Sequence, residues 1–224
     1  MMNAAKVTIE WCGETLVLLH ERAVWWPGEE TVLIADPHFG KAATFRSAGI
    51  PVPETSHDDD MERLSGILAT TGAPRLVILG DFLHARAGRS PGVLSALAAW
   101  RARHAAVEVV LVRGNHDRHA GPLPEEWGIT SVNGPRRLGP FHLRHEPCED
   151  AAAPVVAGHI HPSFRLSGRG GLSVSAPCFH FAKRLAVLPA FGAFTGTHSV
   201  SPAPGDRIFL VGPDSLFETP PFQK

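Results

Sequence analysis

The chain has 224 residues, 44% of them hydrophobic, and a formal net charge of −1 at pH 7. This length and composition are enough to bury one substantial core, which excludes disorder over most of the chain and predicts one α/β domain over residues 1–224. The near-neutral charge excludes binding of nucleic acid through bulk positive charge, so any affinity for a polyanion must be local.

The predicted elements alternate between short strands and helices. Residues 6–11 and 14–20 alternate in polarity around Cys12-Gly13, which predicts a hairpin. Continuous apolar runs predict buried strands at residues 31–36, 75–81, 107–114 and 154–159. Between them, helices are expected over about residues 57–70 and from Ser90-Pro91 onward. After residue 170 the pattern is strand-like, ending in a hairpin around residues 212–214.

The cysteines and the apolar runs indicate the compartment. Cys12, Cys148 and Cys178 are widely spaced and form no CxxC pair, which favours reduced thiols over a disulfide framework. No run approaches the roughly 18 apolar residues that a membrane span needs, and the N-terminal segment lacks the apolar stretch of a signal peptide. We expect a cytoplasmic protein with no membrane partner.

Each of the four apolar runs ends in residues that can hold a metal. The runs lead into Asp36-Pro37-His38, Gly80-Asp81, Gly114-Asn115-His116-Asp117 and His159-Ile160-His161, and a further cluster, FHLRHEP, contains His145. In open α/β sheets, ligands gather in the crevice at the carboxyl ends of the strands. Residues far apart in the sequence are therefore expected to converge on one site.

The candidate donors combine carboxylate, carboxamide and imidazole groups without a thiolate. They are Asp36, His38, Asp81, Asn115, His145, His159 and His161. This set suits Mn²⁺, Fe or Zn²⁺ and exceeds what one tetrahedral centre accepts. A carboxylate can bridge two ions about 3.5 to 4 Å apart, and Asp81 lies in the middle of the set. Two divalent cations against two carboxylates leave a charge of about +2, which favours binding of a phosphate.

The order of these motifs resembles that of the calcineurin-like metallophosphoesterase superfamily. The resemblance covers about residues 31–162 and implies a mixed α/β (α+β) fold, a two-sheet β-sandwich flanked by helices in a four-layer αββα arrangement. It also implies a dinuclear centre. Asp36, His38, Asp81 and His161 would hold one ion, and Asp81, Asn115, His145 and His159 the other. In that scheme His116 faces the substrate and Asp117 orients its ring.

A narrower resemblance covers nearly the whole chain. The segments ADPHFGKAATFRSAGIPVP, GDFLHA, RGNHD, LRHEP, GHIHP and LPAFGAFTG are similar to those of the ligase-associated DNA-damage-response endonuclease family of the PdeM type. This resemblance implies a manganese-dependent phosphodiesterase that cuts DNA during repair. An ATP-dependent DNA ligase and a helicase are the partners it implies.

Further residues flank the metal loops. The basic residues beside these loops are candidates for holding neighbouring phosphates of a DNA strand, with solvated surface as the alternative; they are Lys41, Arg46, Arg86, Arg89, Arg113 and Arg118. His84 lies three residues after Asp81 and could support a ligand or cap a helix.

The expected reaction is hydrolysis by a hydroxide that bridges the two ions, with His116 stabilising or protonating the departing oxygen. Two alternatives stay open at this stage. One is a small-molecule phosphatase or nucleotidase with the same core. The other is a metal-binding scaffold that docks repair proteins without turnover.

Overall fold

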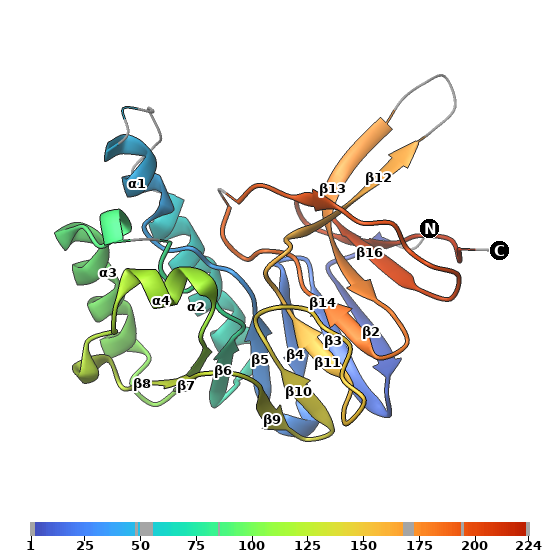
Figure 1. The fold of residues 1–224 in the computed structure, drawn as a ribbon, viewed down its shortest axis with the longest axis horizontal. Helices are drawn as coiled ribbons and strands as arrows, with labels where there is room; N and C mark the ends of the chain where they lie inside the picture. Colours follow the sequence, from blue (N-terminus) through green and yellow to red (C-terminus); the bar gives the residue numbers. More distant parts are fainter. Residues whose placement is uncertain are drawn as a thin grey trace.

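Two β-sheets pack face to face in the computed structural model, which describes residues 3–47, 49, 56–84, 86–167, 173–193 and 195–222 (Figure 1). Their inner faces share one apolar cluster, to which the first sheet gives residues such as Leu33 and Val77 and the second gives Phe141, Phe179 and Phe209. The two-sheet sandwich flanked by helices that the sequence predicted is therefore confirmed. The single domain over residues 1–224 stays a prediction.

The first sheet has seven strands among the described residues, in the order β2-β3-β4-β5-β6-β7-β8. They are β2 (Lys6–Trp11), β3 (Glu14–Leu19), β4 (Ala23–Trp26), β5 (Thr31–Ile34), β6 (Arg75–Ile78), β7 (Glu108–Val112) and β8 (Ile129–Val132). The predicted hairpin is β2–β3, and its turn residues Cys12 and Gly13 have φ of 50° and 85°. From β2 to β5 the neighbours are antiparallel, and from β5 to β8 they are parallel.

The parallel half of this sheet positions the metal loops. Strands β5, β6 and β7 lie side by side in one direction and are buried along almost their whole length, as their continuous apolar runs predicted. Their carboxyl ends consequently meet at one edge of the sheet, where the loops that follow them begin.

Helices cover the outer face of this first sheet (Figure 1). The α-helices are α1 (Lys41–Ser47), α2 (Ser56–Thr71), α3 (Pro91–Arg103) and α4 (Asn115–Ala120), and the short 3₁₀ helices are η1 (Pro27–Glu29), η2 (Arg86–Gly88) and η3 (Glu125–Trp127). Helix α3 begins as predicted, because the Ser90 hydroxyl accepts a hydrogen bond of 3.4 Å from the backbone N–H of Val93. Leu64 of α2 and Trp100 of α3 pack against the strands in a second apolar cluster.

The second sheet has ten strands among the described residues, in the order β1-β17-β16-β13-β14-β11-β10-β9, with β12 beside β13 and β15 beside β12. They are β1 (Asn3–Ala4), β9 (Arg136–Leu138), β10 (Phe141–Leu143), β11 (Val155–Ala157), β12 (Pro162–Ser167), β13 (Ser173–Phe181), β14 (Leu185–Val187), β15 (His198–Ser199), β16 (Arg207–Val211) and β17 (Leu216–Glu218). Strand β11 is the predicted run at residues 154–159, and β16–β17 is the predicted C-terminal hairpin.

Part of the outer face of the second sheet carries a third apolar cluster. Cys178, Ile208 and Leu210 point outward there, because side chains alternate along β13 and β16 with the inward Phe179 and Phe209. Phe164 of β12 and Phe222 cover them, whereas every helix in the described part of the chain lies between residues 27 and 127. Strand β12 and the C-terminal segment thus bury this part of the second sheet.

No helix in the described part of the chain is long and apolar enough to span a membrane.

Candidate metal centre

Loops from both sheets converge at one place. Asp36 and His38 follow β5, Asp81 follows β6 and Asn115 follows β7 of the first sheet, while His145 follows β10 and His159 and His161 follow β11 of the second. Within these loops, side chains form three groups whose donor atoms lie within 4.8 Å of one another. Two of them, Asp36-His38-His161 and Asp81-His145-His159, consist of candidate ligands alone, and the third is His38-His84-His116. The predicted convergence of the seven candidate ligands is present.

The backbone at the centre is held in an unfavourable conformation. Of the eight non-glycine residues with positive φ in the described part of the chain, five are candidate ligands: Asp36 (51°), His38 (48°), Asp81 (50°), His159 (72°) and His161 (49°). Left-handed backbone costs free energy in most residues and is less unfavourable for Asp and His. Such conformations concentrate where the fold must aim a side chain at a site.

The first group lies around the loop after β5. Nε2 of His38 is 3.3 Å from Nε2 of His161, and Nε2 of His161 is 3.8 Å from Oδ2 of Asp36. His161 directs Nε2 inward because its Nδ1 donates to the backbone carbonyl of Gly196 at 2.9 Å. A carbonyl only accepts, so this bond requires the proton on Nδ1 and leaves Nε2 free to bind a metal.

The second group is ordered in the same way. Nδ1 of His145 donates to the carbonyl of Leu79 at 3.0 Å, which leaves its Nε2 facing Oδ1 of Asn115 at 2.9 Å and Nδ1 of His159 at 2.9 Å. Three donors of two types, two imidazoles and a carboxamide, therefore point at a common position beside Asp81.

Asp81 lies between the two groups. Its Oδ1 is 3.5 Å from Nε2 of His145, and its Oδ2 is 3.8 Å from Nε2 of His38. The carboxylate is buried, and the backbone N–H of His116 donates to Oδ1 at 3.0 Å. One oxygen facing each group suits a carboxylate that bridges two ions.

The residues present fit a pair of divalent cations. Asp36 is fully buried, and its Oδ1 has no hydrogen-bond partner. Burial, and next the nearby Asp81, raise the pKa of Asp36 well above its usual range, while burial and then His161 lower the pKa of His38 to about 2. The buried carboxylates have too little positive charge near them, and the imidazoles beside them are neutral. Bound cations would stabilise such a set of groups. The cysteines Cys12, Cys148 and Cys178 belong to neither group.

His84 and His116 form a layer above the first group. Their rings stack with centroids 4.8 Å apart, and Nδ1 of His84 is 3.3 Å from Nδ1 of His38. Nδ1 of His116 contacts the backbone carbonyl of His84. His84 thus touches both a candidate ligand and the candidate catalytic histidine, and its supporting role stays a prediction.

Asp117 accepts hydrogen bonds from backbone groups in the structure, and its expected role in orienting the His116 ring stays a prediction. Its buried carboxylate accepts from the backbone N–H groups of Phe82 at 2.9 Å, Leu83 at 3.4 Å and Gly114 at 2.9 Å. It therefore ties the loop after β6 to the loop after β7. The partner of the His116 ring in the structure is the carbonyl of His84, because the Asp117 oxygens are committed to backbone donors.

Comparison with known families fits this geometry. Residues 30–160, more than half of the chain, match the family model for calcineurin-like phosphoesterases. This chain belongs to the calcineurin-like phosphoesterase family. The family is built around a dinuclear metal centre, so the chain is a metal-dependent hydrolase of phosphoric esters.

The phosphoesterase also resembles solved structures. The crystal structure of Pseudomonas putida nuclease MPE is 42% identical, covers 95% of this chain and 100% of its own, and superposes with a TM-score of 0.82. A protein of unknown function, AQ665 from Aquifex aeolicus, is 18% identical over 63% of this chain and 81% of its own, with a TM-score of 0.39. YfcE, a phosphoesterase from E. coli, is 19% identical over 83% of this chain and 90% of its own, with a TM-score of 0.38. The last two scores add nothing to the assignment, and no curated protein sequence matches the chain.

The candidate DNA-binding residues of the phosphoesterase differ in their exposure and in their contacts. Lys41 is half-buried at the start of α1, close enough to the centre for its charge to lower the pKa of Asp36 against the larger effect of burial. Arg86 is exposed on η2. Nη1 of Arg89 donates to the carbonyls of Ala120 at 3.2 Å and Pro122 at 2.8 Å, which gives this arginine a structural role. The side chain of Arg46 lies outside the described residues.

The segment LPAFGAFTG has a role that the sequence did not reveal. The backbone N–H of Phe191 donates to the carbonyl of Ala35 at 2.7 Å, so the segment extends along the loop that carries Asp36. Arg63 of α2 donates to the carbonyl of Phe191 and lies 4.2 Å from its ring centroid. The segment also supplies the Gly196 carbonyl that orients His161. The segment therefore packs behind the loop that carries Asp36. In the sequence, only its similarity to a known family had marked it as important.

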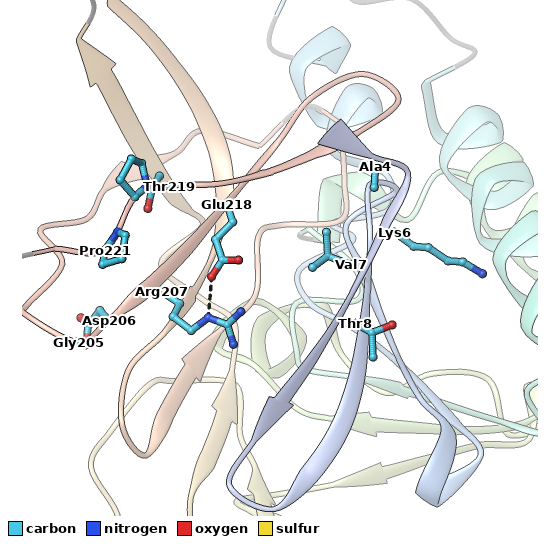
Figure 2. Close-up of a pocket in the computed structure, with 11 residues that line it drawn as sticks. Ala4, Lys6, Val7, Thr8, Gly205, Asp206, Arg207, Glu218, Thr219 and Pro221 are labelled. Carbon is cyan, nitrogen blue, oxygen red and sulfur yellow. Dashed lines mark hydrogen bonds and ion pairs between the residues drawn. The ribbon is translucent and has the colours of Figure 1, made fainter. Parts of the chain in front are cut away.

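A separate hollow of 790 Å³ lies away from the centre, between β2 and the β16–β17 hairpin (Figure 2). Arg207 and Glu218 pair across its wall at 2.7 Å, and Lys6 points away from them. The candidate ligands do not line it, so its volume has no bearing on the reaction centre.

We predict that Gly114→Ala disrupts the centre. A Cβ atom at Gly114 would overlap Oδ1 of Asp81 and approach Cε1 of His145 to 2.9 Å, so both side chains must shift. The variant should lose metal in elemental analysis and unfold in urea with a free energy lower by about 1–3 kcal/mol. Gly92→Ala in α3 is the matched control, because nothing lies within 4 Å of its added Cβ. Equal metal content in the two variants would contradict the prediction.

We predict that Asp81→Ala releases both ions, because each of its oxygens faces one group of ligands. Elemental analysis of the dialysed variant should find less than one metal per chain and no hydrolysis. Asp214→Ala, which removes an exposed carboxylate from the β16–β17 turn, should keep the wild-type metal content. Two metals per chain in Asp81→Ala would show that this residue does not bridge them.

Proposed function

We propose that this phosphoesterase is an endonuclease that hydrolyses phosphodiester bonds in DNA with two manganese ions. The observation that carries the proposal is the 42% identity to Pseudomonas putida nuclease MPE over 95% of this chain. The segments HFGKAATFRSAGIP and LPAFGAFTG, which lie outside the metal motifs, favour the same family of repair endonucleases. A role in DNA repair beside an ATP-dependent ligase and a helicase in the cytoplasm belongs to this proposal.

The two groups of donors would hold the ions. Asp36, His38 and His161 would bind one, His145, His159 and Asn115 the other, and Asp81 both. When bound, two divalent cations activate water for attack on phosphorus and neutralise charge on the phosphoryl oxygens. The donor set of oxygen and nitrogen atoms also accepts Fe or Zn²⁺, so manganese is the choice that the resemblance favours.

His116 is placed to act on the leaving group. With Nδ1 committed to the carbonyl of His84, its Nε2 is the atom that can take up and release a proton. That Nε2 lies 4.0 Å from Oδ2 of Asp81, and the side chain is 36% exposed, so it faces both the centre and the solvent from which substrate enters. Protonation of the departing oxygen by such a group contributes about 10²- to 10⁴-fold to the rate.

We predict that His116→Ala keeps both metals but slows hydrolysis by about 10²-fold or more on a diester with an alkoxide leaving group. The loss should shrink for bis(p-nitrophenyl) phosphate, because nitrophenolate departs without a proton. Rates on the two substrates and elemental analysis test the assignment. Loss of metal together with activity would make His116 a ligand, and equal losses on both substrates would remove its role as an acid.

We predict that the purified protein with Mn²⁺ opens circular single-stranded DNA. A circle has no ends, so only an endonuclease can cut it, and gel electrophoresis distinguishes circles from linear products. Because phosphate contacts release counterions, cleavage should weaken as salt rises and tolerate changes of sequence.

The competing function is a nucleotidase with the same centre. It would leave circles intact, hydrolyse mononucleotides rapidly and show little dependence on salt. That combination of results would overturn the proposed DNA substrate and leave the phosphoesterase assignment standing.

A further inference from the structure

A small basic hollow adjoins the metal centre on the side of the second sheet. It has a volume of 120 Å³, and its wall includes the guanidinium side chains of Arg113, Arg118 and Arg144 together with His145 and Glu146. Arg113 and Arg118 come from the end of β7 and from α4, and Arg144 follows β10. His145 also belongs to the second ligand group, so a single imidazole separates the hollow from the candidate metal position.

The hollow carries an excess of positive charge. Three guanidinium groups line it against one carboxylate, Glu146, in a chain whose net charge is −1. Arg144 is paired through Nη2 with Asp150 at 3.0 Å, yet its Nε is buried and has no hydrogen-bond partner. The side chain of Arg118 is exposed and forms no hydrogen bond or ion pair within the described part of the chain. Donors without acceptors favour binding of an anion.

We propose that this hollow binds the phosphate next to the scissile one in a nucleic acid strand. The proposal rests on the proposed function and names a contact that selects a polymer over a mononucleotide. Arginine suits this role because its planar group donates two parallel hydrogen bonds to a phosphate. The volume of 120 Å³ is that of about four water molecules at ~30 Å³ each, which is enough to admit a phosphate group.

Of the basic residues that the sequence offered for this role, Arg113 and Arg118 line the hollow, whereas Lys41, Arg86 and Arg89 do not. Arg89 uses its Nη1 on two backbone carbonyls, so that nitrogen is not available to a strand. Arg113 also has a backbone partner, the carbonyl of Asp117 at 3.2 Å, and therefore holds α4 as well as lining the hollow. Arg118 therefore offers the most available donors, and Arg144 adds positive charge beside them.

The test uses p-nitrophenyl esters, in which the good leaving group fixes the bond that breaks. In one pair of substrates, the ester is placed on the 5′- or the 3′-phosphate of thymidine, which has no neighbouring phosphate. In the second pair, the ester is placed on the 5′- or the 3′-phosphate of the dinucleotide TpT, which has one neighbouring phosphate on a defined side. With Mn²⁺, the wild-type enzyme should prefer the TpT ester by about tenfold in kcat/KM for at least one polarity, because a hydrogen bond to a charged group is lost in the smaller substrate.

Arg118→Gln and Arg144→Gln should each reduce this preference to within about twofold. Arg103→Gln is the matched control, an exposed arginine on α3 that pairs with Glu62, and it should keep the wild-type preference. A TpT ester whose neighbouring phosphate is a neutral methylphosphonate repeats the test on the wild-type enzyme without any variant. It should react like the thymidine ester.

The outcomes separate this inference from the proposed function. If circles are opened but the TpT preference is absent, survives in both variants or survives with the methylphosphonate, the hollow does not bind the phosphate and the endonuclease proposal stands. If the enzyme cleaves neither the diesters nor circular DNA, the proposed function fails and the inference fails with it.

Discussion

The structure depends on holding two buried carboxylates, Asp36 and Asp81, beside a set of neutral imidazoles at the junction of two sheets. Removing such carboxylates from water is costly unless opposite charge compensates them. The rise in the pKa of Asp36, which burial causes first and Asp81 second, reflects that cost in the protein without ions. Two divalent cations would remove it, which links metal binding to the stability of the loops.

Much of the surrounding structure keeps these groups together. Left-handed backbone at five candidate ligands aims their side chains inward, and glycines at positions 80 and 114 leave room for His145 and Asp81. Asp117 ties two of the loops through backbone donors, and the Gly196 carbonyl fixes the tautomer of His161. The Asp117 and Gly196 contacts join residues that are at most 35 positions apart in the sequence. The contact between LPAFGAFTG and the loop at Asp36 joins segments that most of the chain separates.

The sequence predicted the parts of the fold that local patterns determine. Continuous apolar runs at residues 31–36, 75–81 and 107–114 identified three parallel strands, and the polar residues after them identified the centre. The sequence did not reveal the partner of the His116 ring, because a backbone carbonyl leaves no mark in the side-chain pattern. It also did not distinguish Arg89, which binds carbonyls, from arginines whose donors are available, because that depends on tertiary packing. The covering of the second sheet by β12 and Phe222 is a tertiary contact of the same kind.

The most direct measurement of the central claim is anomalous X-ray diffraction at the manganese edge from crystals of the wild-type protein grown with Mn²⁺. Two peaks about 3.5 to 4 Å apart are expected, one beside His38 and His161 and the other beside His145 and His159, with Asp81 coordinating both. A single peak, or two peaks of which Asp81 coordinates only one, would contradict the account.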